Sequence, residues 1–205
     1  MGWNLDELLW LIPAFVIAIA AHEASHALAA TLLGDPGPRQ QGRLSLNPLR
    51  HLDPLGTVAL FLVGFGWGKP VVVNPWRFRV SPATGMAIVA FAGPLANLVS
   101  AAAFGLPLRL HAELPVALLQ LCFVVANINV LLAVFNLIPL PPLDGFSVLM
   151  GVLPHRAAAR IAPLAQHGPA GLLALFAISY LLRLNLIGVI ITPPLRILRP
   201  LVIGI

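Results

Sequence analysis

The sequence has very little charge. Only 9% of its 205 residues are Asp, Glu, Lys or Arg, whereas a soluble domain carries about 25%. With 59% hydrophobic residues, the chain lacks the polar groups to cover a water-exposed surface, which excludes a soluble globular protein. Intrinsic disorder is excluded as well, because it requires low hydrophobicity. The mean hydropathy of +0.94 points to the lipid bilayer as the solvent.

Cysteine and acidic residues are also scarce. The single cysteine, Cys122, excludes an internal disulfide, and seven acidic residues stand against twelve basic ones. In so apolar a chain, the excess of basic residues is better explained as the charge that orients a protein in the membrane than as a nucleic-acid binding surface. We therefore expect no nucleic-acid partner. The start is acidic at Asp6 and Glu7 and lacks the basic residues of a cleavable signal, so the first apolar run is expected to remain as an anchor.

Long apolar runs are what the sequence does have. Four are long enough for the roughly 20 residues that span a bilayer as a helix. They predict an all-α polytopic membrane protein, a single membrane-embedded domain over 1–205, with a core over about 8–150 and a C-terminal span and interfacial tail over about 166–205. The runs are 8–33, 84–106, 114–137 and 171–191.

Two interruptions predict local departures from helix. Residues 57–63 are too few to span, and the glycine-rich stretch 64–70 leads into Val71, Val72 and Val73, which is typical of a short membrane-associated β-hairpin or strand. A simple structural hairpin is an equal alternative. The proline-rich stretch 138–145 predicts a re-entrant or broken segment, and the tail from Thr192 is expected to lie in the membrane interface.

The basic residues predict an orientation. Eight lie in the loops 34–83 and 146–168, and three lie on the opposite side, so the N-terminus is expected outside and the loops in the cytoplasm of a multi-pass cell-membrane protein. The eight are Arg39, Arg43, Arg50, Lys69, Arg77, Arg79, Arg156 and Arg160, and the three are Arg109, Arg196 and Arg199.

A candidate metal pair lies in the first apolar run. His22 and His26 are four residues apart, which places both imidazoles on one helix face, where they can reach one metal ion. Glu23 between them can accept a proton from water at that metal. Ionisable groups are expensive inside a membrane and are functional hypotheses by default. The alternative is a pair of histidines hydrogen-bonded within the helix bundle beside a protonated glutamate.

A catalytic zinc site usually has three protein ligands. Among the acidic residues, Asp144 follows the proline-rich break on the membrane side at which the first helix ends, so it is the candidate third ligand. The alternative is an aspartate that caps a helix before Gly145.

The pattern His22-Glu23-x-x-His26, followed by Asn136-x-x-Pro139-x-Pro141-x-Leu143-Asp144-Gly145, resembles the site-2 protease family of intramembrane zinc metallopeptidases. Further matching motifs lie between these two, and together they extend the resemblance over about residues 8–150. They are Asn47-Pro48-x-x-His51-x-Asp53-Pro54-x-Gly56, Gly66-Trp67-Gly68-Lys69-Pro70 with Val73-Asn74-Pro75, and Ala92-Gly93-Pro94-x-x-Asn97.

The resemblance implies a zinc metalloendopeptidase that cleaves within or near transmembrane segments, in regulated intramembrane proteolysis or the clearance of membrane remnants. It assigns one Zn²⁺ per chain to His22, His26 and Asp144, and the general base to Glu23. It also makes Asn136 a substrate-backbone contact. The strand at 71–73 would pair with an unwound substrate.

Other assignments stay open from the residues alone. Asn97 is a candidate substrate or oxyanion contact, or equally an interhelical packing residue, whereas Asn127 and Asn129 favour interhelical hydrogen bonds. The expected partners are a transmembrane substrate, the bilayer and an unknown regulatory membrane protein. The competing functions are a non-enzymatic transporter or scaffold with a structural metal, and a metal-free glutamate peptidase.

Overall fold

A computed structural model describes residues 5–56, 58 and 67–204 and confirms an all-α polytopic architecture. Within that part of the chain, five stretches are long and apolar enough to cross a membrane, against about four expected from the sequence. They are Leu8–Leu33, Pro82–Arg109, Val116–Asn136, His155–Leu181 and Leu186–Ile203.

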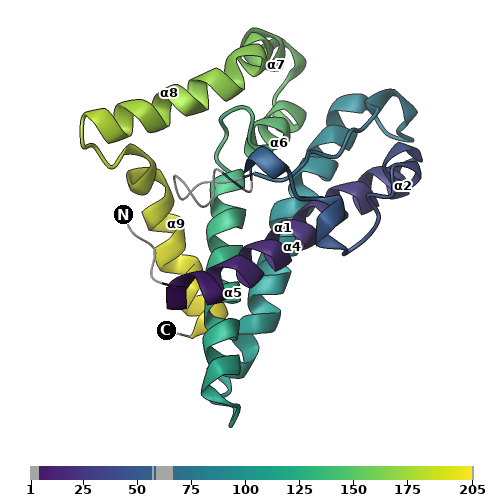
Figure 1. Ribbon diagram of the computed structural model, residues 1–205. Coiled ribbons are helices and arrows are strands. Elements are labelled where there is room, and N and C mark those ends of the chain that lie inside the picture. Colours follow the sequence, from purple (N-terminus) through teal and green to yellow (C-terminus); the bar gives the residue numbers. More distant parts are fainter. Residues whose placement is uncertain (1–4, 57, 59–66, 205) are drawn as a thin grey trace.

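Four long helices form the packed bundle. Helices α1 (Leu5–Leu33), α4 (Pro82–Arg109) and α5 (Val116–Asn136) pack against one another, and α9 (Leu186–Ile203) packs against α4 and α5 (Figure 1). The first three coincide closely with the expected spans. Small residues such as Ala18, Ala27 and Gly93 are buried in these helices, and small side chains allow the close backbone approach typical of helix contacts in a bilayer.

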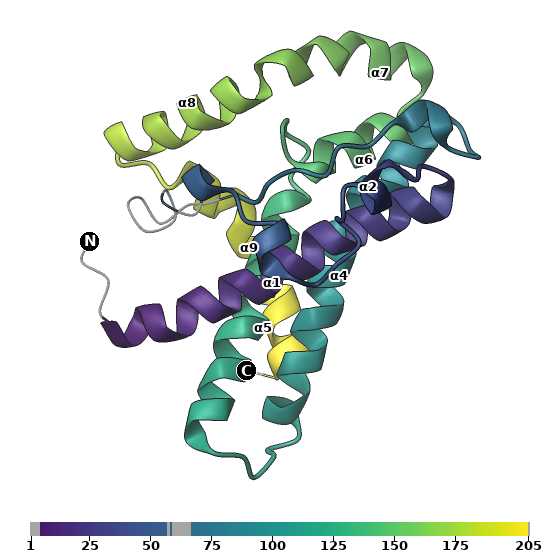
Figure 2. The same ribbon diagram turned by 45° about the vertical axis from the view of Figure 1, so that its right-hand side comes forward.

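The C-terminal expectation is corrected by the structure. The run 171–191 is not one span: α8 (Gly168–Leu181) ends before Arg183, which has a φ of 54°, and Asn185 caps the new helix α9 by accepting a hydrogen bond from Gly188 N. The tail from Thr192 is not a separate segment, because it continues α9 and buries Leu195 and Ile203. Helix α8 lies across the end of the bundle in both views (Figures 1 and 2).

The remaining elements are short. After α5 the chain turns through 137–143, as the proline-rich break predicts, into α6. The short elements are α2 (Gly37–Gln40), η1 (Pro48–Arg50), η2 (Pro75–Arg77), α6 (Asp144–Val152), α7 (His155–Ile161) and η3 (Ala162–His167).

The expected β-hairpin is not formed by the described residues. Their one sheet-type pairing is an isolated antiparallel bridge between Leu52 and Gly68, and residues 71–73 are extended without belonging to a strand. Two separate hydrogen bonds with side chains, at residues 72 and 74, hold this segment in place of a ladder of backbone hydrogen bonds. The proline that follows at 75 has no N–H to donate to such a ladder. The expected short apolar piece and the start of the hairpin, residues 57 and 59–66, lie outside the described residues.

Candidate active site

The two histidines and the glutamate of the first motif are buried in α1. His22, Glu23 and His26 are exposed by only 4%, 9% and 8%. The ring centroids of His22 and His26 are 4.5 Å apart, as expected for positions separated by about one helical turn. Leu33 ends α1 seven residues after His26, which places the pair about 10 Å along the helix from that end.

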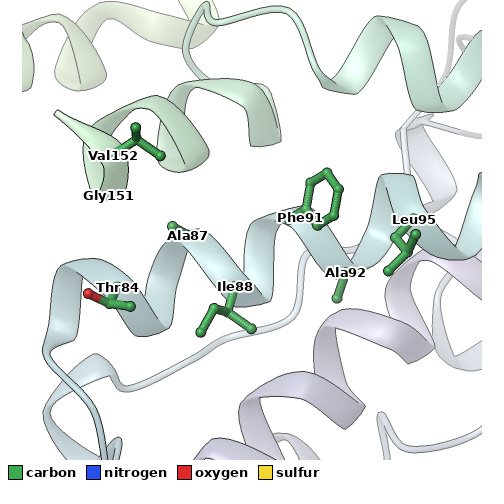
Figure 3. Close-up of a pocket in the computed structure, with 8 residues that line it drawn as sticks. All are labelled: Thr84, Ala87, Ile88, Phe91, Ala92, Leu95, Gly151 and Val152. Atoms are coloured by element: carbon green, nitrogen blue, oxygen red, sulfur yellow. The ribbon is translucent and has the colours of Figure 1, made fainter.

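Asp144 is brought to these histidines by two glycines of α6. A Cβ at Gly145 would lie 2.3 Å from the carbonyl oxygen of Leu137, so glycine allows the start of α6 to rest on the end of α5. A Cβ at Gly151 would lie 2.3 Å from the Cβ of Ala87, so the other end of α6 rests on α4. Figure 3 shows this contact beside the apolar groove between the two helices. Both ends of α6 are therefore fixed.

The side chain of Asp144 points at the imidazoles. Its Oδ2 atom lies 3.1 Å from Nε2 of His22 and 3.4 Å from Nε2 of His26. Burial raises the pKa of the Asp144 carboxyl, but the two imidazoles outweigh burial and bring the pKa to about 2, so the group is an anion at neutral pH. The N-cap residue of α6 is Leu143 and not Asp144, which argues against the helix-cap alternative.

The other ring nitrogen of each histidine has a partner on α4. Nδ1 of His22 lies 2.6 Å from Oδ1 of Asn97, and Nδ1 of His26 lies 2.7 Å from the carbonyl oxygen of Val89. Both partners direct the Nε2 atoms toward Asp144. Histidines that bind metals in proteins are held in this way by a hydrogen bond from the second nitrogen.

Gly93 makes room for both rings. A Cβ there would lie 2.5 Å from Nε2 of His26 and 2.7 Å from Cε1 of His22. Pro94 follows directly and has no N–H to donate to the carbonyl of Ala90, the residue after Val89, whose carbonyl faces His26. The motif at 92–97 therefore supplies the face of α4 against which the imidazoles pack.

Comparisons with known proteins agree with this geometry. The family model "Peptidase family M50" matches residues 110–178, which include Asn136 and Asp144. A protein of Bacillus subtilis (strain 168) named "Putative zinc metalloprotease YwhC" is 35% identical over 182 residues, covering 85% of this chain and 83% of that protein. The chain belongs to peptidase family M50, the site-2 protease family.

Further M50 relatives carry the same kind of name. A protein of Mycobacterium tuberculosis (strain ATCC 25618 / H37Rv) named "Putative zinc metalloprotease Rip2" is 32% identical over 177 residues, which cover 81% of this chain and 66% of that protein. No solved structure matches this chain. The M50 membership makes the chain a zinc metalloprotease, as the resemblance implied.

In this M50 protein a glycine brings an extended segment beside Glu23. A Cβ at Gly68 would lie 3.3 Å from Oε1 of Glu23 and 3.1 Å from Cγ2 of Ile19, so the backbone at Gly68 rests directly on α1. The backbone N–H of Lys69 then donates to the carbonyl of His51 at 2.6 Å. The carboxylate therefore lies between its own helix and a backbone segment.

The valines expected to contact substrate continue from this segment. The side chain of Gln41 donates to the carbonyl oxygen of Val72 at 3.3 Å, and the backbone N–H of Asn74 donates to Oδ2 of Asp35 at 2.7 Å. Val72 is 68% exposed, whereas Val71 and Val73 are half-buried. These two hydrogen bonds connect the segment to the residues that follow α1.

The asparagines divide into two groups. Asn97 is fully buried and its amide nitrogen donates to acceptors within the protein, which favours the packing role over a contact with substrate. Asn129 joins it across the α4–α5 contact, as predicted. Asn127 does not bridge helices but donates to Phe123 of its own helix, and Asn136 likewise donates to Leu132.

One member of this constellation gives no sequence signal. Val89 acts through its backbone carbonyl, which every residue type possesses, so no motif could have marked it. Gly93 and Gly145 both stand in the motifs quoted above, and a close backbone approach is the physical meaning of glycine at such positions.

Proposed function

We propose that this M50 zinc metalloprotease is an intramembrane endopeptidase that hydrolyses peptide bonds within or near the transmembrane segments of other membrane proteins. The observation that carries the proposal is the convergence of three ligand atoms, from His22, His26 and Asp144, within 4.8 Å of one another in an apolar helix bundle. Expensive polar groups that converge inside a membrane protein mark a functional site.

The donor set fits one zinc ion per chain. Two imidazoles and one carboxylate are a ligand set of catalytic zinc sites, which keep a further position open for water or substrate. Oδ2 of Asp144 is buried, and apart from the two imidazole nitrogens no hydrogen-bond partner is present among the described residues. Bound in such a site, zinc supplies polarisation of a carbonyl group and a lower pKa for water.

Glu23 is the proposed general base. Its carboxylate lies beside the ligand histidines on α1 and against the backbone at Gly68. From this place it would accept a proton from the attacking water and return it to the amine that leaves. Asn136, near the turn that leads to Asp144, is proposed to contact the substrate backbone.

The substrate must be locally unwound, because the peptide bonds of a transmembrane helix are hydrogen-bonded and shielded. The extended segment that includes Val71, Val72 and Val73 passes the same end of α1 and is proposed to pair with the unwound chain. Its exposed residue at position 72 supports this assignment. We also propose that an unknown membrane protein regulates this cleavage.

The proposed orientation places the site near the cytoplasm. Eight basic residues lie in the range 34–83, which follows the end of α1 in the sequence, and in the range 146–168, which includes most of α6. The positive-inside rule therefore supports an external N-terminus.

The decisive experiment compares wild type with Glu23→Gln in detergent, measuring zinc content and cleavage of a test protein with one transmembrane helix. We expect about one zinc in both proteins and cleavage by the wild type alone, because the amide preserves shape but accepts no proton. Glu113→Gln, which lies in the loop between α4 and α5, is the matched control and should cleave normally.

Asp144→Ala separates the ligand assignment from its alternatives. We expect its zinc affinity to fall, whereas unchanged affinity would contradict the ligand set. If wild type and Glu23→Gln both bind zinc and neither cleaves any transmembrane substrate, a scaffold with a structural metal replaces the protease mechanism proposed here.

A further inference from the structure

A chain of buried amides leads away from the metal site. Asn97 on α4 donates through Nδ2 to the carbonyl oxygen of Ala18, at 3.0 Å, and to Oδ1 of Asn129 on α5, at 2.8 Å. Asn129 in turn donates through Nδ2 to the carbonyl oxygen of Val125, at 2.9 Å. Both asparagines are 0% exposed, so no water competes for these bonds.

The backbone carbonyls at the ends of this chain of amides determine which atom donates in each of its hydrogen bonds. Backbone carbonyls can only accept, so the Val125 carbonyl requires the amide nitrogen of Asn129 and leaves its oxygen facing Asn97. That oxygen and the Ala18 carbonyl both require the amide nitrogen of Asn97. The oxygen of Asn97 is therefore the atom that faces His22, 2.6 Å from Nδ1.

An oxygen at that position requires a donor, so Nδ1 of His22 carries a proton. Nε2 is then the nitrogen that can present a lone pair to a metal ion, and it is the one that faces Asp144. If the amide of Asn97 were turned over, its NH₂ would face Nδ1 and favour the opposite tautomer, whose Nε2 carries the proton and binds no metal. The ligand state of His22 thus depends on two amide orientations.

His26 is held without such a relay, that is, without a chain of hydrogen-bonded amides behind it. Its Nδ1 faces the backbone carbonyl of Val89, an acceptor that cannot turn over. His22 has a side chain as its partner, and that side chain needs its own partners to stay in one orientation.

We propose that Asn129 is a positioning residue of the zinc site: through Asn97 it holds His22 in the tautomer whose Nε2 atom binds the metal. Among the described residues Asn129 forms hydrogen bonds with Asn97 and Val125 and with none of the three ligands, so this role goes beyond the ligand set. It rests on the proposed assignment of zinc to His22, His26 and Asp144.

The test measures zinc affinity of the purified full chain in detergent, by competition with a chromophoric chelator. Asn129→Leu keeps the side-chain volume and removes both hydrogen bonds. We expect its zinc affinity to fall about tenfold, at the lower end of the 10–100-fold range for residues behind a metal ligand, and Asn97→Leu to fall further within that range.

Asn127→Leu is the matched control. Asn127 is on the same helix and donates through Nδ2 to the carbonyl four residues earlier, as Asn129 does, but it faces no other asparagine among the described residues. Its replacement should leave zinc affinity unchanged. The double variant Asn97→Leu/Asn129→Leu should bind zinc no more weakly than Asn97→Leu, because the two residues act in series.

Asn129→Asp distinguishes a directed hydrogen bond from simple packing. A buried, neutral carboxyl group has one O–H to donate to Val125 and one oxygen to accept from Asn97, so it should restore zinc affinity to within about threefold of wild type. Helical content and thermal unfolding of the metal-free proteins, measured by circular dichroism, establish that each variant is folded. If Asn129→Leu is unfolded, the smaller Asn129→Ala takes its place.

Three results would overturn the proposal. Wild-type affinity in folded Asn129→Leu or Asn129→Ala would show that the relay does not act on the metal. Equal loss in Asn129→Leu and Asn129→Asp would show that the position only packs. A wild-type chain without zinc affinity would overturn the metal assignment in Proposed function, and this proposal with it, whereas the first two results leave that assignment intact.

Discussion

The contact between α1 and α4 and the contact between α5 and α9 are built differently. The buried residues of the first include small and polar ones such as Ala18, Gly93 and Asn97. The second is formed by branched apolar side chains, including Val134 and Leu195. Both join long apolar helices, yet directional hydrogen bonds hold the first and dispersion contacts hold the second.

This difference separates function from stability. Side chains at the α1–α4 contact are fixed in orientation by specific acceptors, so a small displacement should alter metal binding before it alters folding. At the α5–α9 contact, lost atoms should weaken packing and leave the metal site in place. Substitutions matched in size can test the separation.

The largest effect is expected for Gly93→Ala. The added methyl group would lie 2.5 Å from Nε2 of His26, and the ring ends can turn away at little cost to the fold. We expect zinc affinity to fall roughly 100-fold, as for other groups that orient metal ligands, and proteolysis to be lost with it. A zinc titration and a circular dichroism spectrum of the same preparation would measure both parts.

Gly171→Ala is the control for that change. A Cβ at Gly171 meets no heavy atom within 4 Å, so the substitution should leave zinc affinity unchanged and raise helix stability by up to about 1 kcal/mol. Equal zinc affinity in the two variants would contradict the proposed crowding at the imidazoles.

An intermediate effect is expected for Leu195→Ala. Leu195 packs in the cluster with Val130, Val134 and Ile191, and its truncation leaves a cavity that costs of the order of 2 kcal/mol. The melting temperature in detergent should fall by several degrees, with zinc affinity within twofold of wild type. Leu173→Ala removes the same atoms from a residue that is 65% exposed and should shift melting far less. A loss of zinc affinity in Leu195→Ala would contradict the statement that the α5–α9 contact affects stability without affecting the metal site.

The smallest effect is expected outside both contacts. Nη1 of Arg77 lies 3.5 Å from Oδ1 of Asp35, but the Arg77 side chain is 53% exposed, and such pairs contribute about 0–1 kcal/mol. Asp35 also accepts hydrogen bonds from the backbone N–H groups of Gly37 and Asn74. Arg77→Ala should therefore change the melting temperature by less than Asp35→Ala does in a paired thermal scan; the reverse order would show that the ion pair dominates.

The sequence predicted the parts that depend on residue type. Hydropathy located the first three spans. The spacing of His22 and His26, and the place of Asp144 after the proline-rich break, selected the side chains that the fold brings together. The histidine pair and the proline-rich break each carry polar groups that are costly in a bilayer, so their positions indicate a functional site.

The remaining features depend on geometry that residue type does not encode. Hydropathy is continuous through 171–191, which predicted one span there, whereas the chain turns within it, at Arg183 and Asn185. Prolines persist inside α9 because neighbouring helices can satisfy the freed backbone groups. The amide orientations of Asn97 and Asn129 likewise follow from tertiary acceptors.

The partners of the two imidazoles have a consequence for biosynthesis. Asn97 and Val89 follow His22 and His26 by 75 and 63 residues, so α1 is translated well before either acceptor exists. Chains are made from the N-terminus at about 5–20 residues per second, so for several seconds the nascent first helix carries two unsatisfied rings. We therefore expect the packing of α1 to depend on the emergence of α4, and the proposed zinc site to be complete only after Asp144, beyond α5, has been translated.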